Sequence, residues 1–315
     1  SLSTSFLHTC AVLDTGAATC WGAGGFGRLG DGQTNLVRSP ISTLAMPSGT
    51  PVTAIAAGTT HTCALLRTAA VTCWGSDSSG QLGNGAATAN VLTPPSPVTL
   101  PAPGTAVAIA TGGAHTCAVL TGGSITCWGE DSKGQLGNGE PLTDQNAPVA
   151  AFSLPDGRAG VAIDAGENHT CVLASDSTVW CWGENAAGQL GTAANPATQP
   201  VISIVSVLKN TAVAAGGDTT CTLLIDAQLL CLGNNTSGQR GIGAADPTIL
   251  TPVSLPNEAL ATTVPAGSPA TLARPTASAA TGSASLSWAA PTDNGGSAVT
   301  GYRIEQSVDG GPFVV

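Results

Sequence analysis

Charged residues are scarce in this sequence. They make up 9 % of its 315 residues, and 9 Lys plus Arg stand against 19 Asp plus Glu, so the formal net charge is −10. A chain without a basic stripe lacks the electrostatic footprint that binding to a phosphate backbone requires. We therefore expect neither nucleic acid nor an anionic membrane surface as a partner.

Aromatic residues and long apolar runs are also rare. Aromatics make up 3 % of the chain, and no apolar run reaches the roughly 18 residues of a membrane-spanning helix, so we predict no membrane insertion. The single methionine is Met46, and the chain opens at Ser1. We interpret this as removal of a signal peptide or as a segment of a longer protein.

Cysteine, in contrast, is present in pairs that stand ten residues apart. An even count at one fixed spacing predicts disulfides, which persist in oxidising compartments, so we expect an extracellular or cell-surface location. Free buried thiols are the alternative, whereas a zinc site needs more closely spaced ligands. The pairs are Cys10 and Cys20, Cys63 and Cys73, Cys117 and Cys127, Cys171 and Cys181, and Cys221 and Cys231.

The pairs mark an internal repeat. Their first cysteines recur at intervals of 53, 54, 54 and 50 residues, and a fixed period of this size indicates a repeat architecture. Each unit is predicted to begin with a short apolar strand that ends at glycine and to continue into a hairpin whose two strands the disulfide joins. We expect Ser1 to Ser5 to replace that opening strand in the first unit.

Tryptophan and histidine recur at fixed places in the unit. Four tryptophans follow the second cysteine, and we interpret them as repeat core rather than as a ligand platform. Four histidines precede the first cysteine by two residues, and we interpret them as structural residues that bond within their own turns rather than as metal ligands. These residues are Trp21, Trp74, Trp128 and Trp182, and His8, His61, His115 and His169.

Together these positions resemble the regulator of chromosome condensation repeat. The resemblance rests on Ala-Ala-Gly-x-x-His-Thr, a Cys-Trp-Gly strand and Gly-Gln-Leu-Gly-Asn-Gly (80–85 and 134–139), and it covers roughly residues 1 to 258. It implies an all-β fold, a β-propeller of about 50-residue repeats with four strands per blade. Five disulfide-stapled blades are visible, either as a whole ring or as part of seven, and we assign residues 1–263 to this domain.

The remaining residues, 264–315, resemble the first half of a fibronectin type III domain. The residues that carry the resemblance are Pro275, Leu286-Ser287-Trp288, Ala290-Pro291 and Gly301-Tyr302-Arg303-Ile304. We expect an incomplete β-sandwich with open strand edges. The ring itself is expected to close through Leu260 to Gly267 or through two further units before Ser1.

The family resemblance implies several functions. Its members include a nuclear exchange factor, a plant ultraviolet sensor and a secreted bacterial inhibitor of β-lactamase, and the cysteine pairs resemble the secreted bacterial branch. We expect a non-enzymatic extracellular or cell-surface scaffold, an adhesion module or a filament-forming module of a larger secreted protein. Its partner would be a protein or a neighbouring copy, which could exchange a strand with it.

The alternative is a secreted propeller that binds, and inhibits, a protein partner through one face. No Gly-x-Ser-x-Gly elbow or recurring set of base and nucleophile is found, so we predict no enzyme activity. We also predict no catalytic residue, no cofactor and no metal site.

Overall fold

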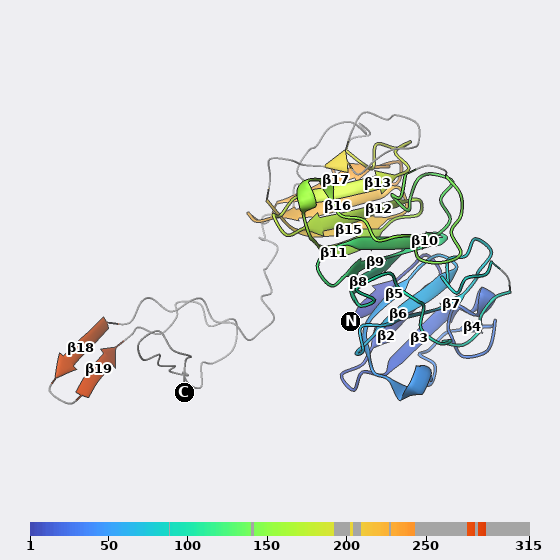
Figure 1. Ribbon diagram of the computed structural model, residues 1–315, viewed down its shortest axis with the longest axis horizontal. Coiled ribbons are helices and arrows are strands. Elements are labelled where there is room, and N and C mark those ends of the chain that lie inside the picture. The colour runs from blue at the N-terminus through green and yellow to red at the C-terminus, as the bar shows by residue number, and fades with distance from the viewer. Residues whose placement is uncertain are drawn as a thin grey trace. The chain divides into compact units, whose positions relative to one another are not determined.

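The computed structural model describes residues 1–87, 89–139, 142–191, 202–203, 209–226, 228–242, 276–280 and 283–287. The chain divides into two units, Ser1–Ser254 and Leu255–Val315 (Figure 1). Within the described ranges every regular element is a strand or a short 3-10 helix, as the all-β prediction requires. The 3-10 helices are η1 (Gly25–Gly27), η2 (Pro47–Gly49) and η3 (Pro155–Gly157).

The described residues of the first unit form five antiparallel sheets, here numbered blades 1 to 5 in chain order. Blade 1 contains β1 (Leu2–Thr4), β2 (His8–Val12), β3 (Ala18–Ala23) and β4 (Leu36–Val37), and blade 2 contains β5 (Val52–Ala57), β6 (His61–Leu66) and β7 (Val71–Gly75). Blade 3 contains β8 (Ala106–Thr111), β9 (His115–Leu120) and β10 (Ile125–Gly129). Blade 4 contains β11 (Gly160–Ala165), β12 (His169–Ala174), β13 (Val179–Gly183) and β14 (Ile202–Ser203), and blade 5 contains β15 (Asn210–Gly216), β16 (Thr219–Leu224) and β17 (Leu229–Gly233).

The first strand of each blade is its inner strand. These strands contact one another in the order β1, β5, β8, β11, β15, so the blades are arranged side by side around a common axis, as in a propeller. The second and third strands follow outward by simple hairpin connections. A fourth strand is present in blades 1 and 4, while in blades 2 and 3 the bridges Gly75 to Val91 and Gly129 to Gln145 hold that place.

One disulfide joins the second and third strands of every blade. The strand register places the two cysteines of each pair directly opposite each other, and their Cα atoms lie 4.1 Å apart in all five pairs. All ten cysteines of the chain are bonded in this way, with no free thiol. The cysteine spacing thus sets the position of one cross-link in each hairpin.

Blade 1 differs from the expectation that it lacks its inner strand. Leu2–Thr4 forms β1, which pairs with β2 through Leu2 to Ala11, Ser3 to Cys10 and Thr4 to Thr9. The expectation was wrong because pairing depends on backbone hydrogen bonds, which Leu-Ser-Thr supplies as well as an apolar sequence does. The apolar pattern that marks the inner strand elsewhere is absent here, but the strand is present.

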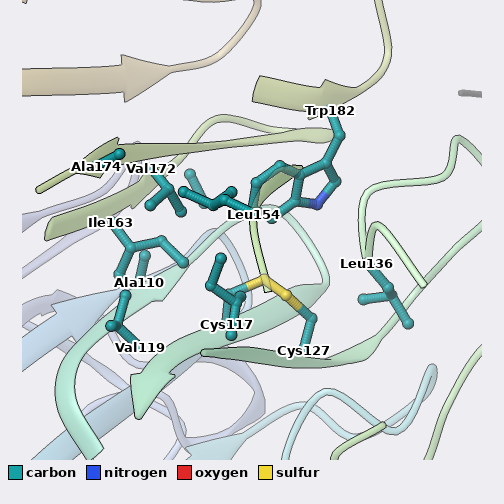
Figure 2. Packing of buried hydrophobic residues seen from close by; sticks show 12 residues of the cluster. Ala110, Cys117, Val119, Cys127, Leu136, Leu154, Ile163, Val172, Ala174 and Trp182 are labelled. Carbon is teal, nitrogen blue, oxygen red and sulfur yellow. A yellow bond between two sulfur atoms is a disulfide. The ribbon is translucent and has the colours of Figure 1, made fainter. Parts of the chain in front are cut away.

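The hydrophobic core lies between neighbouring blades. Around the Cys117–Cys127 disulfide of blade 3, Val119 and Ile125 pack with residues of blade 4, among them Trp182, whose side chain is fully buried (Figure 2). The Trp182 ring meets Phe152 edge to face at a centroid distance of 5.8 Å. Such interblade packing is what a repeat array needs, because one repeat cannot bury its own hydrophobic faces.

In the second unit the structure describes one hairpin, β18 (Thr276–Ala280) with β19 (Ser283–Ser287). The other residues that carry the fibronectin type III resemblance lie outside the described ranges. So do the proposed closing segment, Leu260 to Gly267, and the expected domain boundary at residue 263. These three expectations stay predictions.

Candidate binding site

A hydrogen-bonded latch connects each blade to the next. The Nε2 atom of His61 in blade 2 lies 2.8 Å from Oγ1 of Thr116 in blade 3, and this hydroxyl donates to the carbonyl oxygen of Gln81, back in blade 2. The same carbonyl oxygen accepts from Nε1 of Trp128 in blade 3. Three of the fixed repeat positions, the His, the Thr and the Trp, therefore share one junction.

The latch recurs around the array. The equivalent histidine bonds are His8 to Thr62, His115 to Thr170 and His169 to Thr220, at 2.7, 2.9 and 2.8 Å. The equivalent carbonyl oxygens belong to Arg28, which accepts from Thr62 and Trp74, and to Gln135, which accepts from Thr170 and Trp182. In blade 5 the tryptophan position holds Leu232, which packs in the core instead.

These contacts show the role of the histidines that recur in the repeat. The imidazole of each histidine bonds across to the next blade, so the expectation of a bond within its own turn was wrong for the side chains of His61, His115 and His169. Their backbone carbonyls do accept from a glycine of that turn. The His8 side chain has a bond of the expected kind as well, from the Ser5 hydroxyl to Nδ1 at 2.8 Å. The interpretation of the tryptophans as repeat core is confirmed for Trp74, Trp128 and Trp182, which are fully buried, whereas Trp21 is partly buried.

The histidine protonation state follows from the latch. Since the Thr116 hydroxyl gives its proton to Gln81, it must accept one from His61, which is therefore protonated at Nε2 and carries a lone pair at Nδ1. Burial and the nearby His115 and His8 lower the pKa of His61 to about 3. The histidines are thus neutral and structural.

A cavity lies where the inner strands end. Its volume is about 440 Å³, which is within the range of small-ligand pockets, roughly 300–1,000 Å³. Every blade contributes the last residues of its inner strand and the turn that follows. The lining residues are Thr4, Ser5, Phe6, Ala57, Gly58, Thr59, Thr111, Gly112, Ala165, Gly166, Glu167, Ala215, Gly216 and Gly217.

Backbone hydrogen bonds between blades hold the rim of this cavity. The amide of Thr59 donates to the carbonyl of Gly112 at 3.2 Å. The amide of Gly113 donates to the carbonyl of Glu167, and the amide of Glu167 donates to the carbonyl of Gly217, both at 2.9 Å. Each bond joins the turn of one blade to the turn of the next. The rim is therefore a chain of fixed turns rather than a set of independent loops.

Side chains of two inner strands add further links beside the cavity. Ser3 Oγ accepts from the amide of Ala57, and Asp164 Oδ2 accepts from the amide of Ala215, both at 2.9 Å. Burial raises the pKa of Asp164, while the N–H groups of Ala215 and Ala165, which donate to its carboxylate, act in the opposite direction. Asp164 therefore ties blade 4 to blade 5.

Glu167 is the single charged residue among the described residues that line the cavity. Its side chain is exposed, and its Oε2 accepts from the hydroxyl of Thr59 at 2.9 Å. A Cβ placed on Gly113 would lie 2.7 Å from Oε1 of Glu167, so the glycine leaves room for the carboxylate to reach Thr59. Phe6, 90 % exposed, is the single aromatic residue of this lining.

None of the ten cysteines lines the cavity, and the sequence alone does not identify Phe6 or Glu167 as site residues. A signal was nevertheless present in the repeat. The rim is formed by the first variable position of Ala-Ala-Gly-x-x-His-Thr, which directly follows the glycine. The residue at this position varies between blades, and only blades 3 and 5 share the same residue type, a glycine. Its occupants are Phe6, Thr59, Gly113, Glu167 and Gly217.

In the part of the chain that the structure describes, no group of three or more His, Cys, Asp or Glu side chains could hold a metal ion. No helix in the same ranges is long and apolar enough to cross a membrane.

Comparison with known proteins places the fold in a family. The family model described as RCC1-like domain matches residues 1–276. The chain is similar to the human probable E3 ubiquitin-protein ligase HERC6, with 33 % identity over 193 residues (60 % of this chain, 18 % of that protein). It is also similar to the ultraviolet-B receptor UVR8 of Arabidopsis thaliana, with 31 % identity over 186 residues (58 % of this chain, 41 % of that protein). The chain thus spans less than half the length of either relative.

Solved structures agree on the fold. Human WBSCR16 matches with a TM-score of 0.71 at 21 % identity, covering 81 % of this chain and 67 % of that one. Yeast RCC1 (Prp20), solved bound to Kap60, matches with a TM-score of 0.69 at 20 % identity, covering 84 % and 62 %. The fold, the repeat and the family model agree, and this chain belongs to the RCC1-like domain family of β-propellers.

Proposed function

We propose that the chain is a non-enzymatic protein-binding module that works outside the cytosol, as a scaffold, adhesion module or filament-forming module of a secreted or cell-surface protein. Binding to proteins is the general role of RCC1-like propellers, and the yeast relative was solved in complex with a protein. The identity of the partner is not carried over from any relative.

The complete set of disulfides supports the extracellular location. Every blade carries one disulfide at the same place, and all ten cysteines take part. Disulfides at this density are typical of oxidising compartments and rare in the cytosol.

The observation that carries the binding role is the cavity end of the propeller. Residues of all five blades meet there, interblade hydrogen bonds join the turns of blades 2 to 5, and Phe6 and Leu7 of blade 1 are exposed by 90 % and 43 %. Exposed aromatic side chains on a rigid surface are typical anchors of protein interfaces. This end also supports the second candidate function, a secreted propeller that grips and inhibits one partner.

The similarity to ubiquitin ligases does not argue for an enzyme in this chain. The match to human HERC6 extends over 18 % of that protein. The activity of the whole ligase is therefore not assigned to this chain.

Site-directed photocrosslinking tests the proposal. The chain would carry p-benzoylphenylalanine in place of Phe6, or in place of Ile225, which is 70 % exposed but does not line the cavity. We expect ultraviolet light to link the Phe6 position, but not the Ile225 position, to an extracellular protein. One stoichiometric product would favour the inhibitor, and linkage to a second copy would favour the scaffold. Equal linkage at both positions, or an intact protein found with reduced thiols in the cytosol, would contradict the proposal.

A further inference from the structure

The cavity rim combines a carboxylate, an aromatic ring and empty space. Among the described lining residues, Glu167 is the sole charge and Phe6 the sole aromatic, and most other positions are Gly, Ala or Thr. Small side chains leave the volume of about 440 Å³ open. The rim therefore places one carboxylate and one aromatic ring beside a pocket.

Hydrogen bonds hold the carboxylate of Glu167 in one position. Its backbone is held on both sides, through the amide of Gly113 and the carbonyl of Gly217, and its Oε2 accepts from Thr59, two blades away along the array. Oε1 has no hydrogen-bonding partner among the described residues, so one carboxylate oxygen stays available. A fixed acceptor of this kind loses little entropy when a donor binds.

Other acidic side chains on nearby turns are already engaged. Glu184 accepts from Nδ2 of Asn168 and lies 3.6 Å from Nζ of Lys133, and Glu130 accepts from the Ser132 hydroxyl. Glu167 has no such cationic neighbour within the described ranges. Its carboxylate therefore lies at the cavity without a counter-charge.

We propose that the cavity receives a basic side chain, an arginine or a lysine, from a protein partner. The cation would pair with Oε1 of Glu167, and Phe6 would supply a cation–π contact beside it. The net charge of −10 favours the approach of a basic segment. This inference rests on the proposed protein-binding function and names the chemistry of the partner at that end.

A short peptide provides the test. The full chain would be titrated with acetyl-Gly-Gly-Arg-Gly-Gly-amide, and with the same peptide carrying citrulline, which keeps the shape of arginine but not its charge. Amide NMR signals of Thr59, Gly113 and Glu167 would report binding. We expect the arginine peptide to shift these signals at millimolar concentration, more weakly as salt is added, and the citrulline peptide to leave them in place.

Two variants locate the effect. Glu167→Gln removes the charge and keeps the acceptor oxygen, and we expect about tenfold weaker binding of the arginine peptide. Glu184→Gln is the matched control, because Glu184 is acidic and on a neighbouring turn but does not line the cavity, and its binding should equal that of the parent chain. Equal binding of both peptides, equal binding by the Glu167→Gln variant, or no shift with arginine would overturn the proposal.

The same variant separates this inference from the proposed function. If the partner crosslinked at position 6 binds the Glu167→Gln variant as tightly as the parent chain, the basic side chain is excluded while the binding role stands. If the arginine peptide binds and no protein is crosslinked, the cation pocket stands and the protein-binding role fails.

Discussion

Nε2 of His61 and Oγ1 of Thr116 lie 2.8 Å apart, although 55 residues separate them in the sequence. The two residues belong to different blades, and the contact is closed by the carbonyl oxygen of Gln81. The repeat consensus therefore encodes the junction between blades as well as the blade itself. Several measurable consequences depend on this junction.

Removing the latch hydroxyl should destabilise the propeller. Thr116→Val keeps the shape of the side chain but leaves the buried Nε2 proton of His61 without an acceptor, and we expect a loss of about 1–3 kcal/mol in the free energy of unfolding. Urea unfolding monitored by tryptophan fluorescence would measure it. Thr105→Val is the control, because that hydroxyl bonds Thr121 at an exposed site, and its effect should stay within about 0.5 kcal/mol. Equal costs would contradict the latch.

Stability should fall as the pH drops below 6.5. Burial above all lowers the pKa of His61 and His115 to about 3, and that of His8 and His169 to about 4. Between pH 6.5 and about 4 the unfolded chain therefore binds more protons than the folded one, which favours unfolding. At pH 5 each such histidine lowers the free energy of unfolding by about 2 kcal/mol relative to neutral pH.

Urea midpoints between neutral pH and about pH 5 would measure this loss. Burial raises the pKa of Asp77 and Asp164, so these carboxyls act with the opposite sign and offset part of the loss. His169→Gln removes one of the four titrating histidines. The fall in the free energy of unfolding between neutral pH and pH 5 should therefore be smaller in this variant by the contribution of one histidine. A midpoint that stays constant down to pH 5 would refute the prediction.

Glycine at the end of the inner strand should be essential where a histidine packs on it. A Cβ on Gly112 would collide with the ring of His115 and would lie 2.5 Å from the carbonyl oxygen of Gly166. We expect Gly112→Ala to cost about 1–3 kcal/mol through overpacking. The same position in blade 5 is Gly216, where a Cβ would have no neighbour within 4 Å, so Gly216→Ala should be tolerated. Thermal unfolding of the pair tests this, and similar losses would argue against it.

Removing one disulfide should lower stability without altering the fold. The double variant Cys117→Ala and Cys127→Ala opens a loop of ten residues in blade 3, and we expect a loss of about 2–3 kcal/mol. Blade 3 packs against blades 2 and 4. Because its loss of stability would weaken the coupling between these neighbours, the unfolding transition should become broader. The circular dichroism spectrum should stay that of the parent chain, and a collapse of the spectrum would show that the bridge is needed for folding itself.

The cysteine spacing was sufficient to predict where each hairpin lies. Cys117 and Cys127 are neighbours within one supersecondary unit, and their opposition depends on local strand register alone. The burial of Trp128 could be predicted from the recurrence of tryptophan beside the second cysteine in four of the five repeats, a fixed register that favours core packing. Local pattern could not show β1, since Leu2–Thr4 becomes a strand only by pairing with β2.

The sequence by itself determined the repeat and the five disulfide-stapled hairpins, because these depend on contacts between residues that are close along the chain, and the propeller was implied by the family resemblance. The tertiary structure alone decided that His61 bonds Thr116 rather than its own turn, and that Phe6 and Glu167 line one cavity. Such relationships join blades 50 or more residues apart. Their geometry is set by how the blades pack against each other, which no single repeat contains.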